Sequence, residues 1–170
     1  MDKLIYPCIW CNHNAGEIAK KYLSVFPEST IVDENQWVVV ITIHGQRIML
    51  LNGGNMVRPN PSLSLMYLTS KESETAAIYA ALIDGGRELM PLDSYPFSSK
   101  YAWIEDRFGV SWQLYTGKES DIIQRIVPTL MFVGEHNGKA EKAIDFYTSV
   151  FPDSEKRGIL RYTGDEGETA

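Results

Sequence analysis

The sequence predicts an α+β protein made of two βαβββ modules, followed by the start of a second domain of the same kind. An order of one strand, one helix and three strands occurs twice between residues 4 and 116. The segment YLSVFPES at residues 22–29 then returns as YTSVFPDS at residues 147–154. This spacing is much longer than the roughly 20–50 residues of a solenoid unit. We therefore expect a first domain at residues 1–120 and an incomplete second copy at residues 121–170.

The first module opens with a strand at residues 4–11 that leads into a helix. Asn14 is the expected N-cap, because Glu17 three residues later completes a capping-box pattern, and Pro27 ends the helix. Apolar residues recur along the helix at spacings of three and four, which indicates one buried face. Three strands are then expected, at residues 29–34, 36–43 and 46–52.

The second module follows a proline-containing connector at residues 55–62. Thr69 and Glu72 predict the cap of its helix, which runs to Ile83 before a Gly-Gly pair. Strands are expected at residues 63–69, near 87–92, at 101–106 and at 111–116. The last two form a hairpin, since Gly109 supplies the left-handed backbone that a tight turn needs.

The incomplete copy reads as strand, helix, strand. Its strands are expected at residues 126–133 and 155–163, on either side of a helix that contains the repeated segment. Such a fragment leaves strand edges and an apolar face without partners. We therefore expect that the chain is truncated at Ala170 or that another chain completes the copy, and we expect a homodimer.

Composition and charge exclude several classes of function. The net charge of -6 argues against nonspecific binding of nucleic acid or an anionic membrane surface. The sequence shows no apolar run of the roughly 20 residues that a membrane span needs and no signal-peptide pattern, which predicts a cytoplasmic protein. Cys8 and Cys11 spell C-x-x-C on a strand. We interpret both as buried structural cysteines, because a redox pair needs a helix N-terminus and a zinc site needs a second pair.

The hairpin at residues 101–116 carries the best candidate for a site. Alternation along residues 111–116 places Ser111, Gln113 and Tyr115 on one face and Trp112, Leu114 and Thr116 on the other. The adjacent carboxylates Glu105 and Asp106 fit solvated turn residues better than a general acid or base.

Two further groups of residues have alternative interpretations. The tryptophans, among them Trp10, Trp103 and Trp112, belong either to the core or to the wall of an apolar cavity. Asn52 and the two glycines after it fit a strand-ending turn or a place where backbone amides meet a ligand. His13 and His44 fit turn positions.

Three segments give the chain a family resemblance: KKYLSVFPES, HGQRIMLLNGG and EDRFGVSWQLY. Together with the paired modules, they resemble the vicinal oxygen chelate superfamily, which includes glyoxalase I, bleomycin-resistance proteins and extradiol dioxygenases. The likeness is greatest to its PhnB-like group, which carries the label 3-demethylubiquinone-9 3-methyltransferase, and it extends over essentially the whole chain. The resemblance implies that the modules form a cupped mixed sheet around a pocket lined by their first and last strands.

Metal-dependent members of the superfamily carry histidine or glutamate on those strands. The corresponding positions here hold Tyr6 or Cys8, Leu51 or Asn52, Ser62 or Ser64, and Gln113. Only Gln113 keeps the position and length of the usual glutamate, and an amide oxygen is a weak metal ligand. We therefore expect no metal and no cofactor. The label implies S-adenosylmethionine, yet no glycine-rich loop of a nucleotide-like site follows any predicted strand.

Three functions compete on this basis. The first is a module that binds a small hydrophobic or aromatic molecule in a metal-free pocket. Its expected pocket residues are Gln113, Trp10, Trp103, Trp112, Ser64 and Asn52. The second is a divalent-metal-dependent lyase, isomerase or dioxygenase-like enzyme, and the third is the methyltransferase. We favour them in that order.

Overall fold

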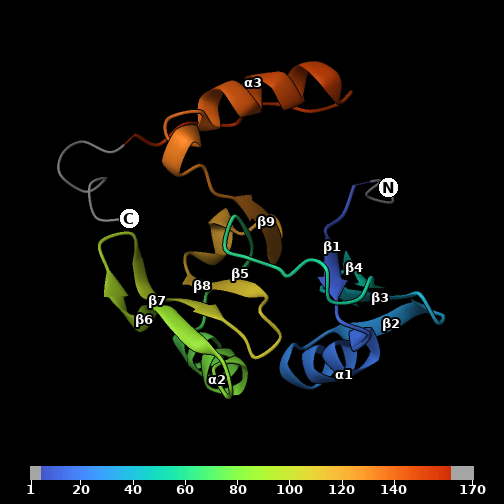
Figure 1. The fold of residues 1–170 in the computed structure, drawn as a ribbon. Helices are drawn as coiled ribbons and strands as arrows, with labels where there is room; N and C mark the ends of the chain where they lie inside the picture. The colour runs from blue at the N-terminus through green and yellow to red at the C-terminus, as the bar shows by residue number, and fades with distance from the viewer. Residues whose placement is uncertain (1–4, 162–170) are drawn as a thin grey trace. The chain divides into compact units, whose positions relative to one another are not determined.

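The computed structural model describes residues 5–161 of the 170-residue chain (Figure 1). The chain divides into two compact units, Met1–Leu130 and Met131–Ala170. In the described residues, no helix is both long and apolar enough to cross a membrane.

The first module forms a four-stranded sheet with the order β1-β4-β3-β2. Its elements are β1 (Cys8–Cys11), α1 (Ala15–Val25), β2 (Ser29–Glu34), β3 (Val38–Ile43) and β4 (Gln46–Asn52). The first strand runs parallel to the fourth, and the other pairs are antiparallel. Because α1 lies between β1 and β2, the chain can return to the far edge of the sheet and then fold back toward β1 through two hairpins.

The second module repeats this order and gains one strand. Its elements are β5 (Leu63–Thr69), α2 (Glu72–Leu82), β6 (Arg87–Tyr95), β7 (Ser98–Glu105) and β8 (Ser111–Thr116). Again β5 runs parallel to β8. The following strand, β9 (Ile126–Leu130), pairs antiparallel with the other edge of β5 and gives the order β6-β7-β8-β5-β9. The strand expected to begin the second copy thus completes the sheet of the first unit.

One core joins the two modules on the helix-facing sides of their sheets. Tyr22 and Phe26 of the first module pack against Trp112 on β8, with ring centroids 5.1 and 4.7 Å apart. Phe26 also contacts the ring of Tyr67 on β5 at 5.3 Å. Aromatic contacts of this kind add to the stabilisation from buried area. The end of α1 therefore fixes the first module against the second.

The helix caps differ from the sequence prediction. Asn14 precedes α1 but makes no side-chain cap bond, and its Oδ1 is buried without a partner among the described residues. Asn52 Oδ1 instead accepts a hydrogen bond from Ala15 N at 3.0 Å, because the β1–β4 register places Asn52 beside Cys11 at the end of β1. The capping-box prediction was therefore wrong for this helix.

The cap of α2 lies two residues later than predicted. Lys71 occupies the N-cap position, and Thr69 is the last residue of β5. The Thr69 hydroxyl donates to Glu74 Oε2 at 2.7 Å and accepts from Lys71 N at 3.2 Å. The threonine thus bonds to the first turn of the helix without being its N-cap.

The second unit contains α3 (Ala140–Val150), which ends in the segment repeated from the end of α1. Tyr147 and Phe151 match Tyr22 and Phe26, but they are 43% and 44% exposed, whereas their counterparts are buried. The strand expected at residues 155–163 is absent over residues 155–161, and its last two residues lie outside the described part.

Candidate functional site

The face of the second sheet that points away from α2 carries the candidate site, and we call it the helix-free face. Gln113 on β8 lies opposite Trp103 on β7 and Met66 on β5, and Ser111 lies opposite Ser64. Directly opposed residues project to the same side of a sheet. Three adjacent strands therefore bring Gln113, Trp103 and Ser64, three of the predicted pocket residues, onto one face.

A directed chain of hydrogen bonds fixes the indole of Trp103. An indole N–H can only donate, and Trp103 Nε1 donates to Ser111 Oγ at 2.8 Å. Ser111 Oγ lies 3.0 Å from Ser64 Oγ, which donates at 3.5 Å to the carbonyl of Pro61. Each hydroxyl proton in this chain therefore has an acceptor. The serines hold Trp103 in place and leave it as a rigid apolar surface.

Gln113 has a different hydrogen-bonding state. Its side chain is 9% exposed, and its Oε1 accepts a hydrogen bond from the Tyr101 hydroxyl at 2.8 Å. Its Nε2 makes no hydrogen bond to any residue that the structure describes. An amide nitrogen carries two N–H groups. Gln113 thus presents hydrogen-bond donors beside the ring of Trp103.

The charged side chains of the helix-free face lie toward its β6 edge. Of the described side chains that β5, β7, β8 and β9 place there, Glu105 is the one charged at neutral pH; it pairs at 2.9 Å with Arg87 of β6, and Asp93 of β6 lies opposite Tyr101. Arg125, which precedes β9, pairs with Glu119 at 2.7 Å. The surroundings of Gln113 are therefore polar and aromatic rather than ionic.

Trp112 does not belong to this site, which corrects the sequence prediction. It is fully buried on the opposite face of β8, against Tyr22 and Phe26 of α1. The alternation that grouped Gln113 apart from Trp112 was correct. A residue next in sequence along a strand cannot line the same face.

Trp10 and Asn52 lie together in the first module. The Trp10 ring packs on Gly53 so closely that a Cβ added there would lie 2.2 Å from the ring, and Trp10 Nε1 donates to the Gly54 carbonyl at 2.7 Å. Asn52 caps α1 and donates to the Gln36 carbonyl at 3.2 Å. The polar groups of Trp10 and Asn52 therefore have partners within the first module, whereas Gln113 lies in the second module.

Asp106 is the residue that sequence reasoning most underestimated. It was expected in solvent, yet it is 4% exposed. One carboxylate oxygen accepts from Tyr22 Oη at 2.7 Å and Trp112 Nε1 at 3.2 Å. The other accepts from the backbone N–H groups of Phe108 and Val110 at 2.9 and 3.0 Å. Burial raises the pKa of Asp106 against these four donors, which lower it. The available signal was an aspartate at the start of the hairpin turn DRFGV, since aspartate side chains commonly accept hydrogen bonds from backbone N–H groups of the turn that follows.

The two cysteines, both predicted to be buried, differ in their exposure. Cys11 is buried and desolvation raises its pKa to about 12, whereas Cys8 is exposed. The prediction of two buried cysteines was therefore wrong for Cys8. The residues lie three apart on β1, so their side chains face opposite sides.

A second polar network links the two modules. His44, in the turn before β4, lies 3.1 Å from Glu28 through Nδ1 and 3.1 Å from Tyr67 Oη through Nε2. The Tyr67 hydroxyl donates to Glu74 Oε1 at 2.6 Å. Desolvation and the Glu74 bond raise the pKa of Tyr67.

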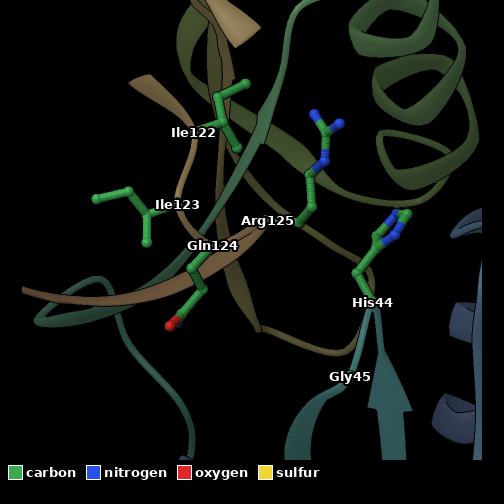
Figure 2. Close-up of a pocket in the computed structure, with 6 residues that line it drawn as sticks. All are labelled: His44, Gly45, Ile122, Ile123, Gln124 and Arg125. Atoms are coloured by element: carbon green, nitrogen blue, oxygen red, sulfur yellow. The ribbon is translucent and has the colours of Figure 1, made fainter. Parts of the chain in front are cut away.

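Two cavities lie near the edges of the second sheet. The first has a volume of about 240 Å³, and Figure 2 shows its His44 and Arg125 side chains extending in the same direction. It is lined by His44, Gly45, Ile122, Ile123, Gln124 and Arg125. The second, of about 420 Å³, lies beside the β6–β7 turn and includes Tyr115 of the helix-free face. Gln113 lines neither of these two cavities.

The donor set does not fit a divalent metal. Within residues 5–161, no three histidine, cysteine, aspartate or glutamate side chains gather in a way that could hold an ion. Around Gln113 the polar atoms come from Tyr101, Ser111 and Ser64, which are neutral hydroxyls. Divalent metals in proteins bind mainly to carboxylates, imidazoles and thiolates.

The strand-to-helix connections do not fit a nucleotide-like cofactor. β1 joins α1 through Asn12, His13 and Asn14, and β5 joins α2 through Ser70 and Lys71. Neither connection contains a glycine that would let the backbone approach a charged cofactor. We therefore derive no methyl-transfer step for this chain.

Comparisons with known proteins give a family and a fold. A family model described as 3-demethylubiquinone-9 3-methyltransferase matches residues 3–115 and 124–170. The PhnB protein from Bacillus cereus is 29% identical, with a TM-score of 0.63 over 68% of this chain and 100% of that one. No curated protein sequence matches significantly.

Two more distant structures share the fold. Protein PA1353 from Pseudomonas aeruginosa is 18% identical, with a TM-score of 0.58 over 68% of this chain and 98% of that one. The fosfomycin resistance protein FosX from Listeria monocytogenes is 11% identical, with a TM-score of 0.53 over 71% of this chain and 94% of that one. These matches confirm the predicted α+β fold of glyoxalases, bleomycin-resistance proteins and dioxygenases.

Proposed function

The chain belongs to the 3-demethylubiquinone-9 3-methyltransferase, or PhnB-like, family of the vicinal oxygen chelate superfamily, and from this premise we propose that it binds a small aromatic molecule without a metal. The bound molecule lies on the helix-free face, against Trp103 and Gln113. The observation that carries the proposal is the pair itself: a fixed indole beside a largely buried amide with unused donors. Binding sites typically combine apolar walls with a few oriented polar groups.

Metal-dependent chemistry is the second candidate. FosX, which has the same fold, was solved in complex with Mn(II) and a sulfate ion. In this chain, glutamine replaces the glutamate that the superfamily resemblance assigns to position 113, and the neighbouring hydroxyls of Tyr101 and Ser111 are neutral. This donor chemistry favours a metal-free site over a metal centre.

Methyl transfer is the third candidate, and it rests on the family description alone. The connections before α1 and α2 lack glycine. A saturable interaction with S-adenosylmethionine, measured by titration calorimetry, would favour this candidate over ours.

The experiment for the proposed function is a ligand screen on the full chain. A library of small aromatic compounds is added to ¹⁵N-labelled protein, and the indole N–H signal of Trp103 and the side-chain amide signals of Gln113 are followed by NMR. We expect some compounds to shift both sets of signals in the wild type and to lose most of their affinity in Trp103→Ala. Trp37→Phe is the matched control, since Trp37 is 64% exposed in the first module. Absence of any shift across the library contradicts the proposal.

Elemental analysis of the same protein tests the metal-free state. We expect less than about 0.1 equivalent of divalent metal after purification without chelators, because neutral oxygen donors hold such ions weakly. Stoichiometric metal that Gln113→Ala removes would contradict our proposal in favour of the second candidate.

We further infer that residues 121–170 begin a second domain and that the chain forms a homodimer. The separate family match at residues 124–170 supports the first inference. The exposed rings of Tyr147 and Phe151, whose counterparts on α1 are buried, support the second. Sedimentation at micromolar concentration is expected to give a dimer, and Tyr147→Ser with Phe151→Ser is expected to give a monomer. A monomeric wild type would contradict the dimer.

A further inference from the structure

We infer that the molecule bound at Gln113 and Trp103 is a neutral aryl carbonyl compound. Its ring packs against Trp103 and its carbonyl oxygen accepts a hydrogen bond from Gln113 Nε2. This inference rests on the proposed function and specifies the chemical class of its ligand.

The hydrogen bonds on the helix-free face indicate which hydrogen-bonding group the ligand supplies. Tyr101 donates to Gln113 Oε1, so the acceptor side of the amide is occupied. Trp103, Ser111 and Ser64 donate in sequence along their own chain, which ends at a backbone carbonyl. The unused donors in this group are therefore the two N–H groups of Gln113. A ligand satisfies them by bringing a hydrogen-bond acceptor.

The position of Trp103 determines the shape of the ligand. Trp103 lies directly opposite Gln113 across the β7–β8 pair, and side chains in that relation have Cβ atoms about 5 Å apart. A flat ring on the indole therefore has its substituent within reach of the amide. The serine chain holds the indole in one orientation, so little conformational entropy is lost when a ring packs on it.

The pairing of the nearby cation determines the charge of the ligand. No lysine, arginine or histidine projects from β5, β7, β8 or β9 on this face within the described residues, and Arg87 of β6, which lies opposite Glu105, is already paired with that carboxylate at 2.9 Å. A carboxylate bound at Gln113 would lose hydration without an unpaired cation to replace it. The chain as a whole carries a net charge of -6, which also opposes an anion. A ketone, aldehyde or amide oxygen meets neither obstacle.

The test compares three small probes of matched size on the full chain: acetophenone, benzoate and ethylbenzene. Each is titrated into ¹⁵N-labelled protein, and the Gln113 side-chain amide signals are identified by their loss in Gln113→Met. We expect acetophenone to shift these signals and to bind about 3- to 10-fold more tightly than ethylbenzene, the ratio that one net hydrogen bond supplies. Benzoate is expected to bind more weakly than acetophenone.

Two variants separate the contribution of the Gln113 N–H donors to the affinity from that of the Trp103 ring. In Gln113→Met the affinity for acetophenone should fall to that for ethylbenzene, while ethylbenzene itself keeps its affinity. Gln113→Glu retains an acceptor for Tyr101 but has no N–H group, so it should also lose the preference for acetophenone. Trp37→Phe should behave as wild type.

Several results would overturn the inference. Equal affinity for all three probes, tighter binding of benzoate, or an unchanged preference in Gln113→Met would each show that the amide donors do not select the ligand. In these cases the proposed binding function still stands, because the probes bind at Trp103. If none of the three probes shifts Trp103 or Gln113, the aryl carbonyl class is wrong, and the wider library screen decides the proposed function separately.

Discussion

Asp106→Ala is expected to be among the most destabilising substitutions in this chain that leave the apolar core unchanged. The carboxylate joins the turn after β7, the core tryptophan of β8 and the end of α1 through four hydrogen bonds. Removing it leaves Tyr22 Oη, Trp112 Nε1 and Val110 N as buried donors without their acceptor. Trp112 keeps a weak contact to Tyr22 Oη at 3.4 Å.

The magnitude follows from the number of donors left without an acceptor. A buried polar group without its partner costs about 1–3 kcal/mol, so three such donors at the lower end of this range predict a loss of about 3–5 kcal/mol in the free energy of unfolding. Asp106→Asn keeps an oxygen for the two backbone donors and loses the acceptor for Trp112. We expect it to cost about 1–2 kcal/mol.

The assay is urea denaturation followed by tryptophan fluorescence. All four tryptophans lie before residue 130, so the signal reports on the first unit. Glu105→Ala is the matched control, since it removes the adjacent carboxylate from a surface pair with Arg87 and should cost less than about 1 kcal/mol. Combining Asp106→Asn with Tyr22→Phe completes a double-mutant cycle, and a coupling energy of about 1 kcal/mol is expected for bonded partners.

The direction of the Asp106 pKa shift determines how its contribution to the free energy of unfolding changes with pH. Burial raises the pKa of Asp106 in the folded protein above its value in the unfolded chain. The folded state therefore binds this proton more tightly, so the contribution is fully present below the unfolded pKa and is lost as the pH rises through the folded pKa. Relative to wild type, Asp106→Asn should flatten the fall in stability from the usual aspartate pKa upward.

Unfolding of Asp106→Ala at the same urea concentration as Glu105→Ala would contradict a stabilising role for the Asp106 carboxylate. A loss equal to that of the control would mean that the four hydrogen bonds are replaced by water at no cost. A stability difference between Asp106→Asn and wild type that grows as the pH rises would contradict the sign of the pKa shift.

The remaining predictions concern backbone packing and thiol reactivity. Gly53→Ala should lower stability by about 1–3 kcal/mol, because its Cβ would overlap the Trp10 ring. Gly16→Ala in helix α1 meets no atom closer than 3.8 Å and should raise stability by about 0.5–1 kcal/mol. Thermal melts that rank the two variants alike would contradict this packing. A disulfide reagent at pH 8 should titrate one thiol in the native protein and two in denaturant, because Cys8 is exposed and the pKa of Cys11 is about 12. Cys8→Ser should abolish the native reaction, and two rapidly reacting native thiols would show that Cys11 is accessible.

Much of the fold could be read from local patterns. The strands at residues 46–52, 63–69 and 111–116 have the predicted bounds, since each is a run of apolar and β-branched residues that ends at a turn or connector. The separation of Gln113 from Trp112 followed from alternation alone. Period and turn chemistry act between neighbours in the chain, and for this reason they are visible without the tertiary structure.

Other features depend on which strands become neighbours. Asn52 caps α1 because β4 lies parallel to β1, a relation between residues 37 apart. Asp106 is buried because α1 brings Tyr22 to the hairpin from 84 residues away. In both cases a local pattern suggested a different role, a turn residue or a solvated carboxylate, and the tertiary contact prevailed.

The sequence by itself determined the two modules, the repeat at residues 147–154 and the face on which Gln113 lies, because these depend on spacing along the chain. Only the tertiary structure decided that the Tyr101 hydroxyl donates to Gln113 Oε1, while the N–H donors of Gln113 remain unused. The same holds for the serine chain that fixes Trp103. Hydrogen bonds between strands depend on register and distance, and these arise when the sheet assembles.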